Sequence, residues 1–188
     1  MALLKRIADL IPPVVLAIIT LAATPNNTSD ATPLQTLFMI KQLLPQTKTV
    51  GLMWEQSDVD YGGIIPQINR AAAAVGVKVV VEDVEQMKDV AERFRDLTQK
   101  YHIQALWIFG NADILASSIA EGFLIKNSTM NSVPLFAPNS NWVSAGACAA
   151  VVSNGSDAEL IVNQKTISVL GMKVPSKYIS ITQFLATN

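Results

Sequence analysis

The sequence predicts a doubly wound α/β sandwich of the flavodoxin type, in which helices cover both faces of one parallel sheet. Between residues 48 and 152, short apolar runs alternate with longer segments of helical periodicity. The short runs are apolar on both faces, which is typical of strands buried between two layers of helices. A chain of 188 residues can bury a core of its own. We therefore expect one domain, from residue 34 to residue 188.

Each expected element has its own local signals. The strands are short runs rich in β-branched and apolar residues, at residues 49–54, 77–84, 105–109, 133–137, 147–152 and 178–184. The helices repeat apolar residues at helical spacing, at residues 34–44, 64–75, 90–101, 112–126 and 157–170. Thr32 and Pro33 are start signals for the first helix, and Gly76 and Gly171 are expected to end two later ones.

The N-terminus carries an apolar run that predicts a membrane-directed helix. Lys5 and Arg6 precede residues 11–23, and these hold no charged side chain. The run has about 13 residues, whereas a signal sequence needs about 7 to 15 and a membrane-spanning helix about 20. Positive charge before such a run places the N-terminus in the cytoplasm and the domain on the periplasmic side of the inner membrane.

We therefore expect residues 1–24 to be a membrane anchor or a signal segment and residues 25–33 to be a linker. The alternative is a buried strand, because the run is rich in β-branched residues. The expected anchor residues are Pro12, Val15, Leu16, Ile18 and Ile19.

Composition and motifs exclude several classes of protein. With 14 Lys and Arg against 15 Asp and Glu, no basic excess favours nucleic acid. Cys148 is the only cysteine, so one chain builds neither a disulfide framework nor a thiolate metal site. The glycine-rich phosphate loops and the G-x-S-x-G turn are missing, and the single histidine, His102, lies between a helix and a strand. We expect a protein that is not an enzyme and holds no cofactor or metal.

The candidate binding site lies in the loops after the third and fourth strands. In an open parallel sheet, ligands bind beyond the carboxyl ends of the strands. An indole exposed in such a loop could stack on a solute or anchor a partner, although Trp142 could instead belong to the core. The candidate ligand- or partner-binding residues are Asn111, Asp113, Asn139, Asn141 and Trp142.

Several segments resemble a known family in order and spacing. They read IKQLLPQTKTVG at residues 40–51, PLFA at residues 134–137 and VSAGA at residues 143–147. Together with residues 105–119, they resemble the ABC-transporter substrate-binding family whose members bind aromatic amino acids such as tryptophan. The resemblance implies one lobe, the C-terminal one, of a type-I periplasmic binding fold. The family usually has an aspartate where this chain has Asn111, and Asp113 lies two positions on.

Two functions follow as expectations from this resemblance. The first is a membrane-anchored accessory subunit, facing the periplasm, whose single lobe holds another protein of a membrane complex. The alternative is the substrate-binding component of an ABC importer for a small solute such as an aromatic amino acid, with a permease as its partner and a second chain completing the cleft.

Overall fold

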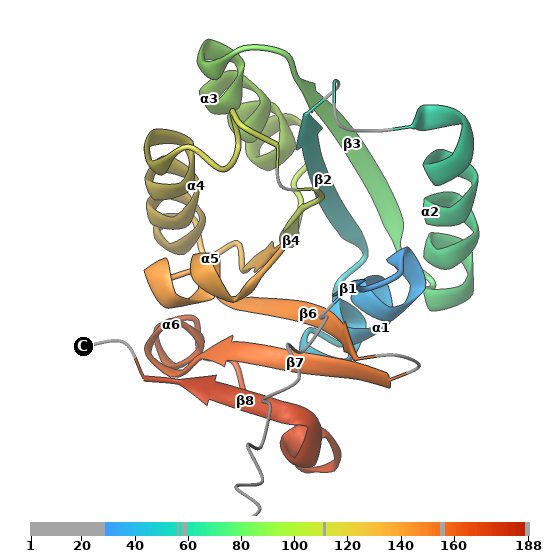
Figure 1. Ribbon diagram of the computed structural model, residues 1–188, viewed down its shortest axis with the longest axis vertical. Coiled ribbons are helices and arrows are strands. Elements are labelled where there is room, and N and C mark those ends of the chain that lie inside the picture. The colour runs from blue at the N-terminus through green and yellow to red at the C-terminus, as the bar shows by residue number, and fades with distance from the viewer. Residues whose placement is uncertain (1–28, 56, 58–59, 111, 155–156, 187–188) are drawn as a thin grey trace, which may run out of the picture.

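Figure 1 shows the computed structural model of the chain, which describes residues 29–55, 57, 60–110, 112–154 and 157–186. The strands are β1 (Ser29–Asp30), β2 (Thr49–Glu55), β3 (Lys78–Val84), β4 (Ala105–Ile108), β5 (Leu135–Ala137), β6 (Ala149–Asn154), β7 (Asp157–Asn163) and β8 (Thr182–Leu185). The helices are α1 (Pro33–Leu43), α2 (Tyr61–Val75), α3 (Met87–Arg95), η2 (Asp96–Lys100), α4 (Ser118–Met130), α5 (Ser140–Ala145), α6 (Gln164–Val169) and η3 (Ser176–Ile181).

The strands form one mixed sheet in the order β3-β2-β4-β5-β6-β7-β8, with β1 paired to β6. The five strands from β2 to β6 run parallel, as the sequence predicted. Strand β7 runs antiparallel to β6, and β8 runs parallel to β7. The α/β class is confirmed, but the expectation of a wholly parallel sheet is wrong at this end of the molecule.

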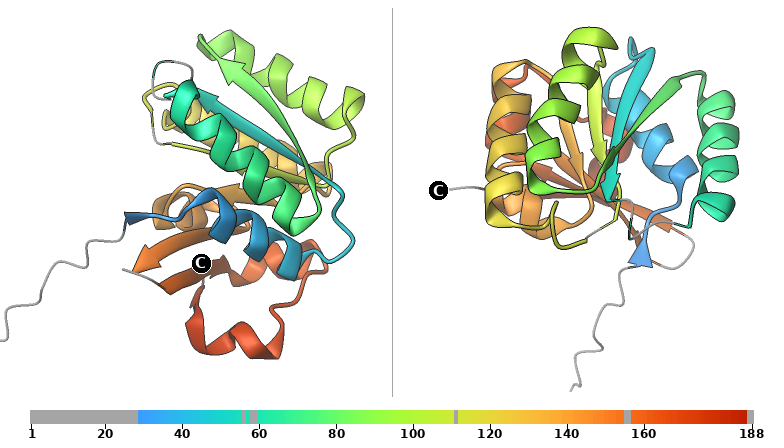
Figure 2. Two further views of the ribbon diagram at one scale, coloured as in Figure 1. Left: turned by 90° about the vertical axis from the view of Figure 1, so that its right-hand side faces the viewer. Right: turned by 90° about the horizontal axis from the view of Figure 1, so that it is seen from above.

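Helices cover both faces of the sheet, as the two views of Figure 2 show. Leu37 and Ile40 of α1 pack with Ile68 of α2 on one face, in a cluster with Trp54 and Phe136. The other face carries a second cluster formed by side chains of α3, η2, α4 and α5. This double cover explains why the central strands are apolar on both sides.

The helix ends predicted from the sequence are confirmed at α1 and α2. Thr32 is the N-cap of α1 and forms a capping box with Gln35. Helix α2 ends at Gly76, which adopts the left-handed conformation with a φ of 74°. The cap at Gly76 ends α2 two residues before β3 begins at Lys78.

The predicted helix at residues 157–170 is wrong over its first half, which forms β7 instead. Only two residues separate Asn154 of β6 from Asp157 of β7. A connection this short joins antiparallel neighbours, because a parallel crossover needs a dozen or more residues. The buried Leu160, Ile161 and Val162 favour a strand, and Asn163 then caps the short helix α6.

Three further boundaries differ from the expectations. Helix α4 begins after its N-cap Ser117 rather than at residue 112. The helix expected at residues 90–101 begins at Met87 and ends in the π-helical turn η2. The strand expected at residues 178–184 is divided into the 3-10 helix η3 and the strand β8.

The expected linker overlaps the domain, because Ser29 and Asp30 pair with Ser153 and Val152 of β6. The expected anchor residues lie outside the described residues, so the anchor stays a prediction. In the described part of the chain, no helix is both long enough and apolar enough to cross a bilayer.

Candidate functional site

The carboxyl ends of β2 to β6 meet at one edge of the sheet, which we call the carboxyl edge. The segments that follow these strands include residues 109–117 after β4 and residues 138–139 after β5. The N-terminal end of α1 reaches the same edge, because Thr36 lies beside Phe109 and Pro138. In open α/β sheets this is the edge at which ligands bind.

A small hollow opens at the carboxyl edge between β4, β5 and α1. Its volume of about 30 Å³ holds no more than one or two water molecules. Aromatic and small apolar residues dominate its lining, which consists of Ala31, Thr36, Trp107, Ile108, Phe109, Gly110, Ala137, Pro138 and Val151. Only a part of a solute the size of an amino acid would therefore fit inside the hollow, and the rest of its surface would stay exposed.

Two of the residues that line this hollow, Trp107 and Phe109, belong to a group of three packed aromatic rings. The ring of Phe109 lies edge-on to those of Trp54 and Trp107, with centroids 6.1 and 5.5 Å apart. Trp54 and Trp107 are buried, and Phe109 is partly buried. Phe109 was missed by the sequence reading, because nothing in the chain distinguishes a strand-end phenylalanine from a core one.

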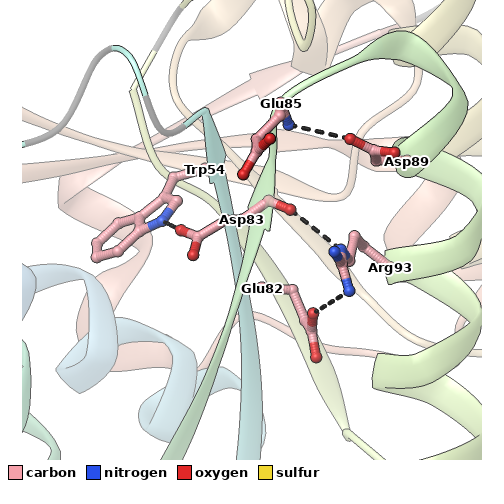
Figure 3. Close-up of polar contacts among 6 residues, drawn as sticks. All are labelled: Trp54, Glu82, Asp83, Glu85, Asp89 and Arg93. Atoms are coloured by element: carbon pink, nitrogen blue, oxygen red, sulfur yellow. Dashed lines mark hydrogen bonds and ion pairs between the residues drawn. The ribbon is translucent and has the colours of Figure 1, made fainter.

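A cluster of charged residues stands beside these rings at the end of β3 (Figure 3). The indole nitrogen of Trp54 donates a hydrogen bond to the carboxylate of Asp83. Arg93 pairs with Glu82 at 3.5 Å and donates from Nε to the backbone oxygen of Asp83 at 3.2 Å. Burial raises the pKa of Glu82, and the nearby Arg93 opposes that shift. These contacts fix the side chains where β3 meets α3.

Glu55 is a buried carboxylate at the carboxyl edge that the sequence reading did not single out. It is the last residue of β2 and only 7% exposed. Its Oε2 accepts a hydrogen bond from Ile114 N at 2.8 Å, and its Oε1 accepts one from Ser57 Oγ at 3.1 Å. Glu55 thus connects the segment after β2 to the segment after β4. A charged residue directly after five apolar strand residues was the only signal for it.

We expect Glu55→Ala to lower the free energy of unfolding by about 2 kcal/mol, because it leaves the Ile114 amide without its buried acceptor. Glu55→Gln retains an oxygen for that amide and should cost less than half as much. Urea unfolding followed by circular dichroism measures both values. Equal losses for the two variants would show that the Ile114 hydrogen bond is not what Glu55 contributes.

The structure does not assemble the predicted site residues into one cluster. Asn111 lies outside the described residues, and Asp113 and Asn141 are exposed. Asn139 is the N-cap of α5, where its Oδ1 accepts from the amides of Asn141 and Trp142. The segment expected to be a loop at residues 139–143 is therefore mostly helical.

The expectation that Trp142 presents an exposed indole is wrong. Trp142 is only 3% exposed and packs in the cluster that contains Leu124 and Leu135. Because residues 140–145 form a helical turn, the side chain at position 142 points back onto the sheet. The alternative interpretation, a core tryptophan, is confirmed.

The chain belongs to a family of ABC transporter substrate binding proteins, whose family model matches residues 13–162. The match begins within the apolar N-terminal run and includes the carboxyl edge. A search of curated protein sequences finds no match to the chain.

Solved structures share the fold at low sequence identity. An ABC domain from Streptococcus pneumoniae in complex with L-Trp superposes with a TM-score of 0.70 and 17% identity, over 82% of this chain and 62% of that one. A substrate binding protein with adhesive properties from Clostridium difficile, in a ligand-free, open structure, gives 0.64 and 24% identity over 81% and 59%. A conserved domain protein from Vibrio cholerae gives 0.67 and 17% over 83% and 61%. The chain thus spans about three fifths of the length of these proteins.

Proposed function

We propose that this chain is a solute-contacting lobe of an ABC substrate-binding protein. Its carboxyl edge would form one wall of a site for a small solute with an apolar or aromatic part. A second lobe or a second chain would supply the other wall, outside the cytoplasmic membrane, before delivery to a permease. The observation that carries this proposal is the hollow lined by Trp107, Phe109 and Pro138 at the edge where α/β sheets bind ligands.

The size of the hollow determines the affinity that one lobe alone can reach. Small-molecule sites bury most of their ligand's surface, and a hollow of about 30 Å³ buries only a fraction of an amino acid. One wall therefore offsets little of the translational and rotational entropy that binding costs.

The same observation favours a second candidate function, an accessory subunit that holds another protein. A lobe that retains the fold but offers so small a hollow would also suit a protein partner, which contacts a surface without needing a deep pocket. A membrane anchor at residues 1–24 would belong to this function, and it stays an expectation.

An NMR titration of the 15N-labelled chain with L-tryptophan, L-phenylalanine and L-leucine tests the first proposal. We expect a dissociation constant weaker than about 1 mM, with amide shifts confined to the carboxyl edge, including Gly110, Ile114 and Asn139. Phe109→Ala should abolish these shifts. Phe184→Ala, which truncates an exposed phenylalanine on β8, should leave them unchanged.

Two results would contradict the proposal. The first is the absence of shifts at any concentration up to the solubility of each solute, which would favour the accessory function. The second is a micromolar constant, which would show that the chain completes a site without a second wall.

A further inference from the structure

Strand β3 is an edge of the sheet and pairs only with β2 within the described residues. The amide of Lys78 donates to the oxygen of Lys48 at 2.8 Å, so the backbone of Lys78 faces β2. Successive residues of a strand direct their backbone groups to opposite sides. Val80 and Glu82 therefore also face β2, while Val79 and Val81 direct their N–H and C=O groups outward.

Both ends of this edge are already occupied. At the start, the amide of Val77 donates to Ala72 O at 3.0 Å, within the C-terminal cap of α2. At the other end, Arg93 Nε donates to the outward oxygen of Asp83 at 3.2 Å, and Asp89 accepts from the amide of Glu85 at 3.3 Å (Figure 3). The open part of the edge is thus a short window centred on Val80.

We propose that this window pairs with the same window of a second copy of the chain, in antiparallel orientation, with a two-fold axis at Val80. Val79 of each copy then lies opposite Val81 of the other, and each such pair exchanges both of its N–H···O bonds. Every outward group of the window finds a partner in this arrangement. The contact is isologous, as two-fold dimer interfaces are.

The charges of β3 favour this register. With the axis at Val80, the exposed Lys78 lies opposite Glu82 of the second copy, and this pair occurs twice. The side chain of Glu82 is 13% exposed and has Arg93 on the same face. A second cation would therefore sit beside a carboxylate that burial already disfavours in its charged form.

The two neighbouring registers are less favourable both in their charge pairs and in their backbone hydrogen bonds. An axis at Val81 places Lys78 opposite Val84 and requires the Asp83 oxygen that Arg93 occupies. An axis at Val79 places Lys78 opposite Val80 and requires the Val77 amide that Ala72 occupies. Of these three registers, only the one centred on Val80 uses backbone N–H and C=O groups for which the described structure shows no other partner.

The dimer would leave the proposed solute site free. Because the two copies of β3 run antiparallel, their carboxyl edges lie at opposite ends of the joint sheet. Dimer formation and solute binding are therefore separate claims, and each can fail without the other.

Cysteine cross-linking of the full chain tests the register directly. At the two-fold axis, Val80 faces Val80 of the second copy as a non-hydrogen-bonded pair, whose Cα separation of about 4.5 Å suits a disulfide. Mild oxidation of Val80→Cys should convert most of the protein to a covalent dimer. The matched variant Val81→Cys, which faces Val79, should stay monomeric on a non-reducing gel. The native Cys148 is buried and burial raises its pKa to about 12, so it should not compete.

Sedimentation of the unmodified chain between about 10 and 500 μM should show a reversible dimer, since an interface of this size is weak. Lys78→Glu should raise the dimer dissociation constant at least tenfold, because it places like charges opposite each other twice. The control Lys48→Glu makes the same charge change at an exposed residue directly before the interior strand β2 and should leave the constant unchanged. A monomer at every concentration, or equal cross-linking of the two cysteine variants, would overturn the proposal.

Discussion

Trp142→Ala is expected to destabilise the fold by about 3 to 5 kcal/mol, the range for truncating a large buried aromatic side chain. Trp142 belongs to the same buried cluster as Leu124 of α4 and Leu135 of β5, so its removal opens a cavity in this cluster. In a domain of this size, such a loss should lower the melting temperature by about 6 to 20 °C. Differential scanning calorimetry measures the shift.

The neighbouring Asn141 provides the control for this variant. Its side chain is exposed, and Asn141→Ala should change the stability by less than about 0.5 kcal/mol. If Trp142→Ala melted like the wild type, the indole would not be part of the core. The interpretation of residues 139–142 as a ligand surface would then return.

The case of Trp142 shows what the sequence could predict and what it could not. The sequence pattern placed the strands β2, β3 and β4 correctly, because each contains a run of apolar residues and lies between two helical segments of the chain. The direction in which a single tryptophan points depends on whether residues 140–145 turn as a helix. Six residues are too few to show a helical period.

The miss at β7 has a different physical origin. Residues 157–170 contain β-branched apolar residues, which favour a strand, and apolar residues at helical spacing, which favour a helix. The local pattern therefore did not distinguish a strand from a helix. The connection from Asn154 to Asp157 is too short for a parallel crossover, so the segment after it forms an antiparallel strand beside β6. Such a constraint comes from neighbouring strands in space and not from the segment itself.

For the candidate site, the sequence predicted the edge of the sheet but not most of the side chains that contact one another there. Strand ends and the rule for open sheets located the loops after β4 and β5. Glu55 and Phe109 were missed because their roles arise from contacts with residues distant in the sequence, such as Ile114, 59 positions away. Asn139 was chosen for its polarity, but its carboxamide oxygen is committed to the start of α5.

The second large effect is expected at Asn163, a buried amide that joins three elements. It is 1% exposed, donates from Nδ2 to Val143 O at 2.8 Å and accepts from the amide of Thr166 at 2.9 Å. Asn163→Ala removes the N-cap of α6, so that the partly buried Thr166 amide loses its acceptor. It also removes a buried hydrogen bond to Val143 O, which keeps the one from the amide of Gly146 at 3.1 Å. We expect a loss of about 2 to 3 kcal/mol in the free energy of unfolding, the sum of a lost cap and a lost buried hydrogen bond.

Asn139 is the matched control, because it caps α5 in the same way but is only partly buried. Asn139→Ala should cost only about 1 kcal/mol, and chemical denaturation of both variants gives the comparison. Asn139→Asp separates capping from ligand contact, since aspartate is as good an N-cap as asparagine. A variant that keeps its stability while losing the solute-induced NMR shifts would return Asn139 to the binding surface. Unchanged shifts would leave it as a cap. Equal losses for the two alanine variants would contradict the larger effect that we expect at the more deeply buried Asn163.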